Sequence, residues 1–203
     1  MSVHPSRLGM GTYLGELSET FSEKVAQTLA YGVNSLHLTT VDTAINYRCQ
    51  RSERLIGNLF ETKKLKRSEV FLSTKGGFIP FDQDIPKNGS ATVQEKILEP
   101  LKLEPEDIID DCHCLHPKYI EWSLNQSLRN LQTNSLDMYL LHNPEFSLGV
   151  FSREVWEKQM VGCFELLEQK AKSGILKSYG IATWQGLRVP ADHAHHISLQ
   201  RLI

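Results

Sequence analysis

The sequence predicts an α/β protein that forms part of a (β/α)8 barrel, with about five of the eight strand–helix units within residues 1–203. Short apolar runs alternate along the chain with longer segments whose apolar residues recur at helical spacing. Because each helix returns the chain to the same end of the sheet, such repeats produce parallel strands. Polar residues suited to acid–base chemistry follow several of these runs, and a site at the carboxyl ends of several strands is typical of the barrel.

An open doubly wound sheet is the alternative architecture, because five strands are enough to complete one. A dinucleotide-binding sheet of that kind carries G-x-G-x-x-G between its first strand and first helix. The corresponding segment here is Gly9-Met10-Gly11-Thr12-Tyr13-Leu14-Gly15, which lacks that spacing. We therefore favour the barrel and treat residues 1–203 as one domain that is incomplete at its carboxyl terminus.

The first two strand–helix units are expected within residues 7–60. Their strands cover Arg7–Gly11 and Ser35–Asp42. The first helix covers Ser22–Tyr31 and stops at Gly32, because glycine commonly follows the end of a helix. The second helix covers Ser52–Phe60. The apolar stripes consist of Val25, Ala26 and Leu29 in the first helix and of Leu55, Ile56 and Leu59 in the second.

The third strand, Val70–Thr74, leads into Lys75 and is followed by a long segment, residues 76–116. A short helix is expected within it at Ala91–Leu98. Loops of this length are uncommon in compact domains and are often functional. The segment is either a substrate lid or a surface excursion, and its departure from the catalytic end of the barrel favours the lid.

The last two units begin with a helix near Pro117, since proline is favoured in the first turn. The strand Leu136–Leu141 then leads into His142. A helix over Val155–Lys172 precedes the final strand, Ile175–Thr183. Beyond it, Leu199, Leu202 and Ile203 have the spacing of an amphipathic helix that has only begun, so we expect a truncated end.

The composition restricts the partners and the compartment. Hydrophobic residues make up 40% and charged residues 23% of the chain, as in ordinary globular proteins, and the net charge of -2 gives no reason to expect nucleic acid or an anionic membrane. The first five residues contain no apolar signal core, and no stretch approaches the ~20 apolar residues that span a bilayer. We expect a cytoplasmic protein with neither nucleic acid nor membrane as partner.

The four cysteines are expected to be free thiols, because no C-x-x-C pair and no secretion signal is present. Cys112-His113-Cys114-Leu115-His116 allows a soft-metal interpretation, but two thiolates one residue apart lack the usual zinc spacing. The histidines at 193, 195 and 196 are interpreted as a polar surface loop. No metal site is therefore predicted.

Four side chains are candidates for a single proton-transfer site, namely Asp42, Tyr47, Lys75 and His142. Lys75 and His142 each follow an apolar strand, and Tyr47 lies five residues after Asp42. Tyrosine normally titrates near ~10, and a neighbouring lysine cation stabilises the phenolate and lowers that pKa. Asp42 can hold the lysine, and His142 can orient a carbonyl oxygen. The set predicts a general acid for reducing a carbonyl.

Four motifs in combination resemble those of the aldo-keto reductase family. Gly9-Met10-Gly11-Thr12 is similar to its opening G-x-G-T. Residues 42–47 and 51–57 are similar to its D-T-A-x-x-Y and the E-x-x-x-G that follows. Residues 136–144 are similar to D-x-Y-x-x-H-x-P, and residues 174–181 to G-K-I-R-x-x-G-V. The match runs nearly end to end, although no single motif would be sufficient.

The resemblance implies an NAD(P)-dependent oxidoreductase that passes a hydride between a nicotinamide and the carbonyl carbon of a small aldehyde or ketone. NADP is the expected cofactor and NAD the alternative. Tyr47 is then the acid, Lys75 lowers its pKa, Asp42 pairs with the lysine and His142 orients the carbonyl. The implied cofactor-binding residues are Gly11, Thr12, Tyr13, Asp42 and Thr183. A cofactor-sensing regulatory protein and a truncated chain without activity are the alternatives.

The chain departs from the family pattern in three ways. Ala182-Thr183 replaces a usual Ser-Asn that hydrogen-bonds the nicotinamide carboxamide, which predicts altered placement of that ring. Extra residues precede Asp42 and indicate a bulge or a shifted strand register. Strands six to eight are missing, which would leave the first and fifth strands as open edges. We expect self-association, in an oligomeric state that the sequence does not define.

Overall fold

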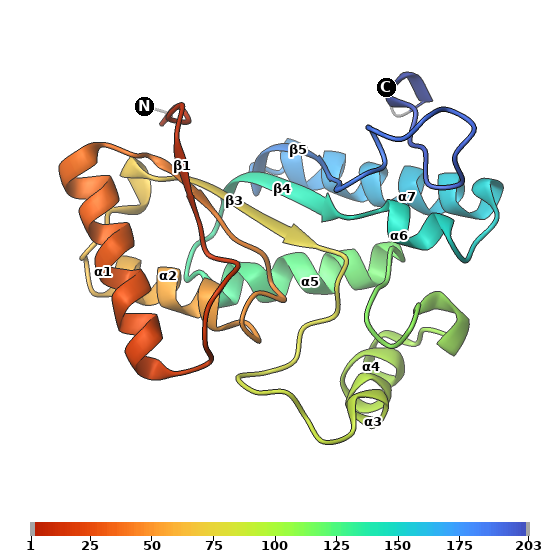
Figure 1. Cartoon of the computed structure of the whole chain (residues 1–203), viewed down its shortest axis with the longest axis horizontal. Coiled ribbons are helices and arrows are strands. Elements are labelled where there is room, and N and C mark those ends of the chain that lie inside the picture. Colours follow the sequence, from red (N-terminus) through yellow and green to blue (C-terminus); the bar gives the residue numbers. More distant parts are fainter. Residues whose placement is uncertain (1–2, 202–203) are drawn as a thin grey trace.

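The computed structural model describes residues 3–201 and contains a five-stranded parallel sheet in the order β1-β2-β3-β4-β5 (Figure 1). The strands are β1 (Gly9–Gly11), β2 (Thr40–Asp42), β3 (Phe71–Gly76), β4 (Leu136–His142) and β5 (Leu176–Ala182). Strand order follows chain order, as in a barrel wall, whereas a doubly wound sheet reverses direction at its centre. The predicted partial barrel is confirmed, and the doubly wound alternative is wrong.

Four long helices follow the first four strands in turn. They are α1 (Glu19–Leu36), α2 (Arg51–Glu61), α5 (Pro117–Asn130) and α7 (Arg153–Lys172). Shorter helices are α3 (Gly89–Val93), α4 (Glu99–Leu101) and α6 (Glu145–Leu148), with a π-helical stretch at Gln94–Leu98 and 3-10 turns at Arg67–Glu69, Pro105–Asp107 and Leu199–Arg201. Ser18 and Ser152 begin α1 and α7, because their side chains accept hydrogen bonds from backbone N–H groups of the first turn.

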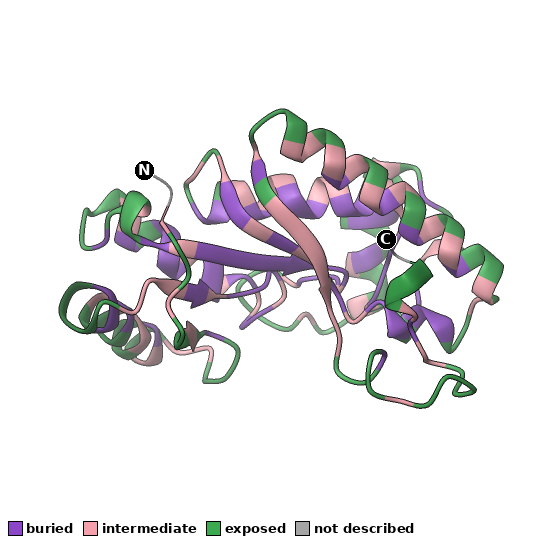
Figure 2. Ribbon diagram, turned by 90° about the horizontal axis from the view of Figure 1, so that it is seen from above, coloured by how far each residue is buried: buried purple, intermediate pink, exposed green. Residues whose placement is uncertain are grey.

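The core lies between the sheet and the long helices. Its sheet side includes Leu72 and Tyr139, and its helix side includes Ile56 and Leu124, all almost completely buried. Figure 2 shows the contrast between the central strand β3, which is buried along most of its length, and β5, which is mostly half-exposed. Burying each such apolar side chain contributes roughly 1.5–3 kcal/mol, so the core fixes the strands and therefore the positions of their carboxyl ends.

Gly32 does not end the first helix, contrary to the sequence-based expectation. α1 continues to Leu36 and ends at His37, whose left-handed backbone directs its N–H to the Gly32 carbonyl. A Cβ at residue 32 would lie 2.3 Å from the sulfur of Met10, so this glycine makes room for a side chain of β1. The extra residues before Asp42 belong to this helix and the turn after it.

The second strand is correspondingly shorter than expected and begins at Thr40, not at Ser35. The pairing proceeds residue by residue, with Gly9, Met10 and Gly11 of β1 opposite Thr40, Val41 and Asp42 of β2. The same three residues of β2 lie opposite residues 71–73 of β3. The pairings are continuous, so the bulge expected before Asp42 is absent from the paired residues of β2.

The two ends of the long segment after β3 are paired with each other. Phe78 and His113 form an antiparallel bridge, and the Cys114 N–H donates to the Gly77 carbonyl at 2.9 Å. The helices α3 and α4 lie in the middle of this excursion (Figure 1). Its two ends are therefore fixed beside the carboxyl end of β3, and its expected function as a lid stays a prediction.

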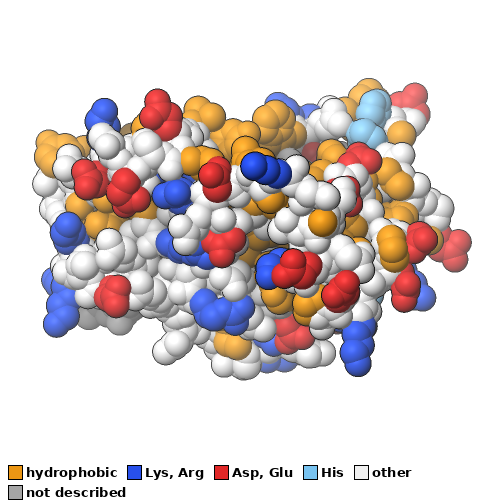
Figure 3. All heavy atoms as spheres, turned by 90° about the horizontal axis from the view of Figure 1, so that it is seen from below, with side chains coloured by type: hydrophobic (Ala, Val, Ile, Leu, Met, Phe, Trp, Pro, Cys, Tyr) orange, Lys and Arg blue, Asp and Glu red, His pale blue; other side chains and the backbone are white. Residues whose placement is uncertain are grey.

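The two outer strands, β1 and β5, each pair on one side only within residues 3–201. Leu199 lies in a 3-10 turn, whereas Leu202 and Ile203, which were expected to continue a helix, fall outside the described residues. No helix of the described chain is long and apolar enough to cross a membrane. On the face drawn in Figure 3, acidic and basic side chains are interspersed, so the visible charges do not gather by sign.

Candidate active site

The four predicted proton-transfer residues meet at the carboxyl end of the sheet. Asp42 and His142 are the last residues of β2 and β4, and Lys75 lies one residue before the end of β3. Tyr47 comes from the turn that follows β2. Because β2, β3 and β4 are neighbours in a parallel sheet, their ends bring these side chains to one place although they are far apart in sequence.

Lys75 is the centre of the cluster. Its ammonium nitrogen lies 2.7 Å from an Asp42 carboxylate oxygen, 2.8 Å from the Thr43 carbonyl oxygen and 3.3 Å from the Tyr47 phenol oxygen. The lysine side chain is buried, and burial lowers its pKa while the Asp42 carboxylate opposes that shift. The carboxylate and the two oxygens therefore compensate for removing the cation from water.

Tyr47 is buried between two other rings. The Tyr13 ring lies 4.9 Å from it and the His142 ring 5.8 Å from it, between centroids. Burial raises the pKa of Tyr47 to about 12, with the Asp42 and Tyr13 charges acting in the same direction. The sequence predicted a lowered pKa, and the pKa is raised instead because removing the phenolate from water is the largest effect. The phenol is therefore protonated at neutral pH, which is the form that a general acid requires.

His142 is neutral over the physiological range. Burial, the Lys75 cation and the nearby His113 together lower the pKa of His142 to about 3. Its Nδ1 atom is buried and has no hydrogen-bond partner within residues 3–201. A neutral imidazole carries one donor and one acceptor, so this ring can donate a single hydrogen bond to a carbonyl oxygen.

His113 supports this strand end and was interpreted from sequence only as one of several candidate metal ligands. It is completely buried, its Nε2 lies 2.8 Å from the His142 carbonyl oxygen, and burial lowers its pKa to about 4. A neutral ring with the proton on Nε2 can donate this bond. Gly77 is required beside it, because a Cβ there would lie 2.8 Å from the same carbonyl oxygen and its φ is +148°.

The turn that carries Tyr47 has an unusual backbone. Arg48, Cys49 and Gln50 all have positive φ, which costs free energy for residues other than glycine. Arg48 is buried and donates to the Glu16 carbonyl and the Ser22 hydroxyl. This anchor offsets the strain and holds the turn after Tyr47, and no local sequence pattern indicated it.

The residues expected to bind the cofactor lie around this cluster and differ from one another in solvent exposure. Thr12 is buried and donates from its hydroxyl to Thr43 at 2.8 Å, whereas Tyr13 is exposed except where it meets Tyr47. Gly11 is paired with Asp42, and a Cβ at Gly11 would meet no atom within 4 Å. Thr183 accepts a hydrogen bond from the Gly186 N–H and so shapes the loop after β5.

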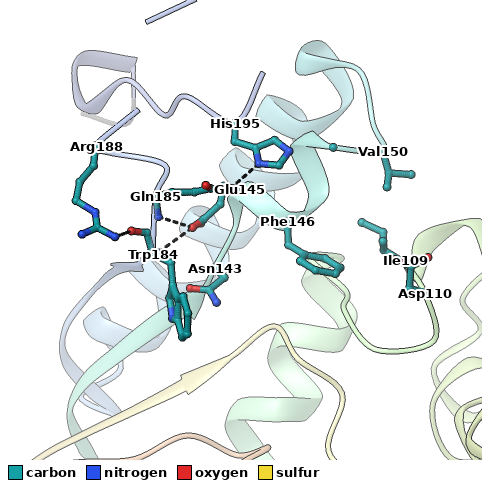
Figure 4. A pocket seen from close by; sticks show the side chains of 11 residues that line it. Ile109, Asp110, Asn143, Glu145, Phe146, Val150, Trp184, Gln185, Arg188 and His195 are labelled. Atoms are coloured by element: carbon teal, nitrogen blue, oxygen red, sulfur yellow. Dashed lines mark hydrogen bonds between the residues drawn. The ribbon is translucent and has the colours of Figure 1, made fainter. Parts of the chain in front are cut away.

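A buried carboxylate, Glu145, lies at the same end of the sheet and was not predicted. It follows His142-Asn143-Pro144, and one of its oxygens accepts hydrogen bonds from the N–H groups of Trp184 and Gln185 at 2.8 and 3.1 Å. It therefore joins the loops after β4 and β5 (Figure 4). An acid three residues after a strand-end histidine was the only signal, because its partners lie 39 and 40 residues away.

In the part of the chain that the structure describes, no group of three His, Cys, Asp or Glu side chains is arranged so that it could hold a metal ion. The Cys114 thiol is buried among apolar residues, and burial raises its pKa to about 12. All four cysteines are free thiols.

Fold and site together define a class: a partial (β/α) barrel with a Tyr–Lys–Asp–His cluster at the carboxyl ends of its strands. The family model for the "Aldo/keto reductase family" matches residues 7–189. This chain belongs to the aldo/keto reductase family, because the match covers most of its length.

Curated relatives support the same assignment at low identity. The chain is 28% identical over 141 residues to "Aldo-keto reductase family 1 member C21" of Rattus norvegicus and 26% identical to the protein of the same name from Mus musculus. Each alignment covers 61% of this chain and 44% of the relative. The chain thus matches less than half the length of these relatives.

Solved structures share the fold. Aldo-keto reductase AKR11C1 from Bacillus halodurans, in its holo form, has a TM-score of 0.61 and 23% identity, and the match covers 91% of this chain and 48% of that one. An aldo-keto reductase from Klebsiella pneumoniae in complex with NADPH has a TM-score of 0.55 and 20% identity, over 87% and 45% of the two chains. The chain therefore has about half of the fold found in these proteins.

Proposed function

We propose that this chain carries the proton-transfer site of an NADP-dependent carbonyl reductase, which converts an aldehyde or ketone to the alcohol or catalyses the reverse. The contact of the Lys75 ammonium with both the Asp42 carboxylate and the Tyr47 phenol supports this proposal more than any other observation. A protonated phenol then lies beside a fixed cation at the carboxyl end of a parallel sheet, the end at which the active sites of barrel enzymes lie.

NADP is the cofactor that we propose, because the Klebsiella pneumoniae relatives were solved with NADPH and with NADP. Gly11, which pairs with Asp42, leaves open space for a bound group, since nothing lies within 4 Å of a Cβ at this exposed position. Gly11, Thr12, Tyr13, Asp42 and Thr183 are the proposed contacts. When bound, the nicotinamide supplies the hydride that adds to the carbonyl carbon.

The residues of this chain would then supply the proton and the orientation. Tyr47 donates its phenol proton to the carbonyl oxygen as negative charge develops there. The Lys75 cation stabilises the phenolate that remains, and Asp42 keeps that cation in place. His142, in its neutral form, donates a hydrogen bond to the same oxygen and so sets the direction from which the carbonyl enters.

Replacing Tyr47 with phenylalanine tests the assignment of the acid. We expect kcat for aldehyde reduction to fall about 100-fold or more, because a positioned acid contributes at least ~100-fold, while the Kd for NADPH stays the same. Tyr31→Phe, at an exposed position of α1, is the matched control and should change neither value. Full activity in Tyr47→Phe would contradict the assignment.

Titration of the unmodified chain with NADPH separates the alternatives. NADPH binding with turnover supports a reductase. Binding with negligible turnover supports a cofactor-sensing protein, and no binding indicates a chain that lacks activity in this form. Fluorescence follows the binding, and oxidation of NADPH at 340 nm follows the turnover.

A further inference from the structure

A hollow of about 530 Å³ lies between the loops that follow β4 and β5 and is bordered on its far side by Ile109 (Figure 4). We call it the β4–β5 hollow. Its volume is within the range of sites that bind small molecules. Asn143, which lines it, follows His142 directly, and the Phe78 ring links the hollow to the proton-transfer site, 5.1 Å from His142 and 5.7 Å from Phe146.

Two residues that line this hollow each carry a buried side-chain oxygen without a hydrogen-bond partner in the described part of the chain. Glu145 is 4% exposed, and while one of its oxygens holds the loop after β5, the other has no hydrogen-bond partner within residues 3–201. The side-chain oxygen of Asn143 is also buried and unpaired there. An unpaired buried acceptor costs free energy, and more so when it is charged, so a group that donates hydrogen bonds would be stabilised.

The charge of the hollow favours a cation over an anion. No described Lys, Arg or His forms an ion pair with Glu145. The guanidinium of Arg188, which also lines the hollow, donates to the Trp184 carbonyl instead. The lining contains two carboxylates, Glu145 and Asp110, against the one guanidinium of Arg188, so carboxylate or phosphate ligands are disfavoured.

The remaining walls are aromatic and partly open. Trp184 is 68% exposed and Phe146 is 37% exposed, and both line the hollow. Aromatic faces attract ammonium groups as well as carbon chains. An ammonium group has three donors, enough for both unpaired oxygens, whereas a neutral hydroxyl has one.

We propose that the β4–β5 hollow binds the ammonium group of an amino-aldehyde or amino-ketone, with Glu145 and Asn143 as acceptors and Trp184 as the covering ring. The proposal rests on the proposed carbonyl reductase function and names its substrate class. The amine end occupies the hollow while the carbonyl lies between Tyr47 and His142.

Two aldehydes of equal size test this preference. 3-Aminopropanal carries an ammonium group where butanal has a methyl group, so their kcat/KM ratio isolates the charged group. We expect a ratio of about 10 or more in the unmodified chain, because a hydrogen bond to a charged group is worth about that factor or more. In Glu145→Gln we expect the ratio to fall to about 1.

Glu145→Gln is an informative variant because its amide oxygen can still accept from the Trp184 and Gln185 N–H groups, whereas its NH2 replaces the free acceptor by a donor. Glu154→Gln, at an exposed position of α7, is the matched control and should keep the preference. A ratio near 1 in the unmodified chain, or an equal ratio in both Glu145 forms, would overturn the proposal.

If neither aldehyde is reduced, the proposed function itself is contradicted. Binding of the corresponding alcohols, measured without cofactor, then still tests the hollow. 3-Aminopropan-1-ol and 1-butanol are the corresponding alcohols, and Trp184 reports on the hollow. A saturable change in tryptophan fluorescence with the amino alcohol alone, lost in Trp184→Phe and in Glu145→Gln but kept in Trp122→Phe, supports the site. No such change for the amino alcohol overturns it.

Discussion

At the scale of single residues, the site depends on groups whose charge states are set by burial. Lys75 is a buried cation with a carboxylate partner, whereas His142 and His113 are buried rings that are kept neutral. The lowered pKa values of the two histidines have a consequence for stability, because a group that resists protonation in the folded state favours unfolding once the solution becomes acidic.

Acid is therefore expected to destabilise the protein through these two rings. An unfolded histidine titrates near 6.5, and the folded values are about 3 for His142 and about 4 for His113. Below pH 6.5 the unfolded chain binds protons that the folded chain does not, so stability falls until the folded pKa is reached. From pH 7 to pH 5 each ring should cost about 2 kcal/mol.

The variant His113→Asn removes one of the two titrating rings and keeps a donor for the His142 carbonyl. We expect its free energy of unfolding, measured by urea denaturation, to fall by about 2 kcal/mol less between pH 7 and pH 5 than that of the unmodified chain. His4→Asn, at an exposed position, should leave the slope as it is. Equal slopes in all three proteins would show that His113 is not a source of acid sensitivity.

The candidate site could be predicted from sequence only where a residue follows a recognisable strand. Asp42, Lys75 and His142 were found because each ends an apolar run, and Tyr47 because it is close to Asp42 in sequence. Glu145, His113 and Arg48 act through partners that no local pattern specifies, such as the N–H groups of Trp184 and Gln185. The shift predicted for the pKa of Tyr47 had the wrong sign because the spacing of residues in the sequence does not reveal how deeply the phenol is buried.

At the scale of helices and strands, the periodicity of apolar residues predicted which elements form but not where tertiary packing ends them. The apolar spacing located every long helix and every strand, but α1 extends past Gly32 to Leu36. A helical glycine has two explanations, a stop signal or a close approach, and only the position of Met10 distinguishes them.

Two helical glycines should therefore respond differently to alanine. A Cβ at Gly57 of α2 would lie 2.2 Å from the Asn130 backbone carbonyl oxygen, so α2 and the end of α5 must move apart. We expect Gly57→Ala to lower the free energy of unfolding by about 1–3 kcal/mol, as overpacking does. Gly32→Ala meets only the flexible end of Met10, and its helix propensity gain of about 1 kcal/mol offsets part of the clash.

Urea denaturation of the two variants compares these effects directly. We expect the unmodified chain and Gly32→Ala to have similar free energies of unfolding, and Gly57→Ala to be clearly less stable than both. If both variants lost the same stability, the distinction between a backbone and a side-chain neighbour would not hold. Circular dichroism of the folded variants serves as the control for helix content.

At the scale of the whole molecule, the sheet formed by residues 3–201 has two unpaired edges, β1 and β5, and a half-exposed inner face. Alternate residues of the three strands β3, β4 and β5 point to that face, among them Phe71, Met138, Leu140 and Gly180, and none of these four is completely shielded. In a closed barrel the corresponding positions fill the interior. The exposed face and the free strand edges favour pairing with another sheet.

We therefore expect the 203-residue chain to self-associate, through the edge and inner face of β5. Sedimentation velocity between about 5 and 100 µM should show a weight-average mass that rises above the 23.1 kDa of one chain. Gly180→Lys should reduce this rise, because an inward-facing charge at an edge strand opposes pairing, and its Cβ has ordinary contact distance, 3.6 Å, to Leu140. Gln169→Lys adds the same charge on the exposed face of α7 and should associate like the unmodified chain. A monomer at every concentration, with cooperative melting, would show that the sheet is stable with its edges open.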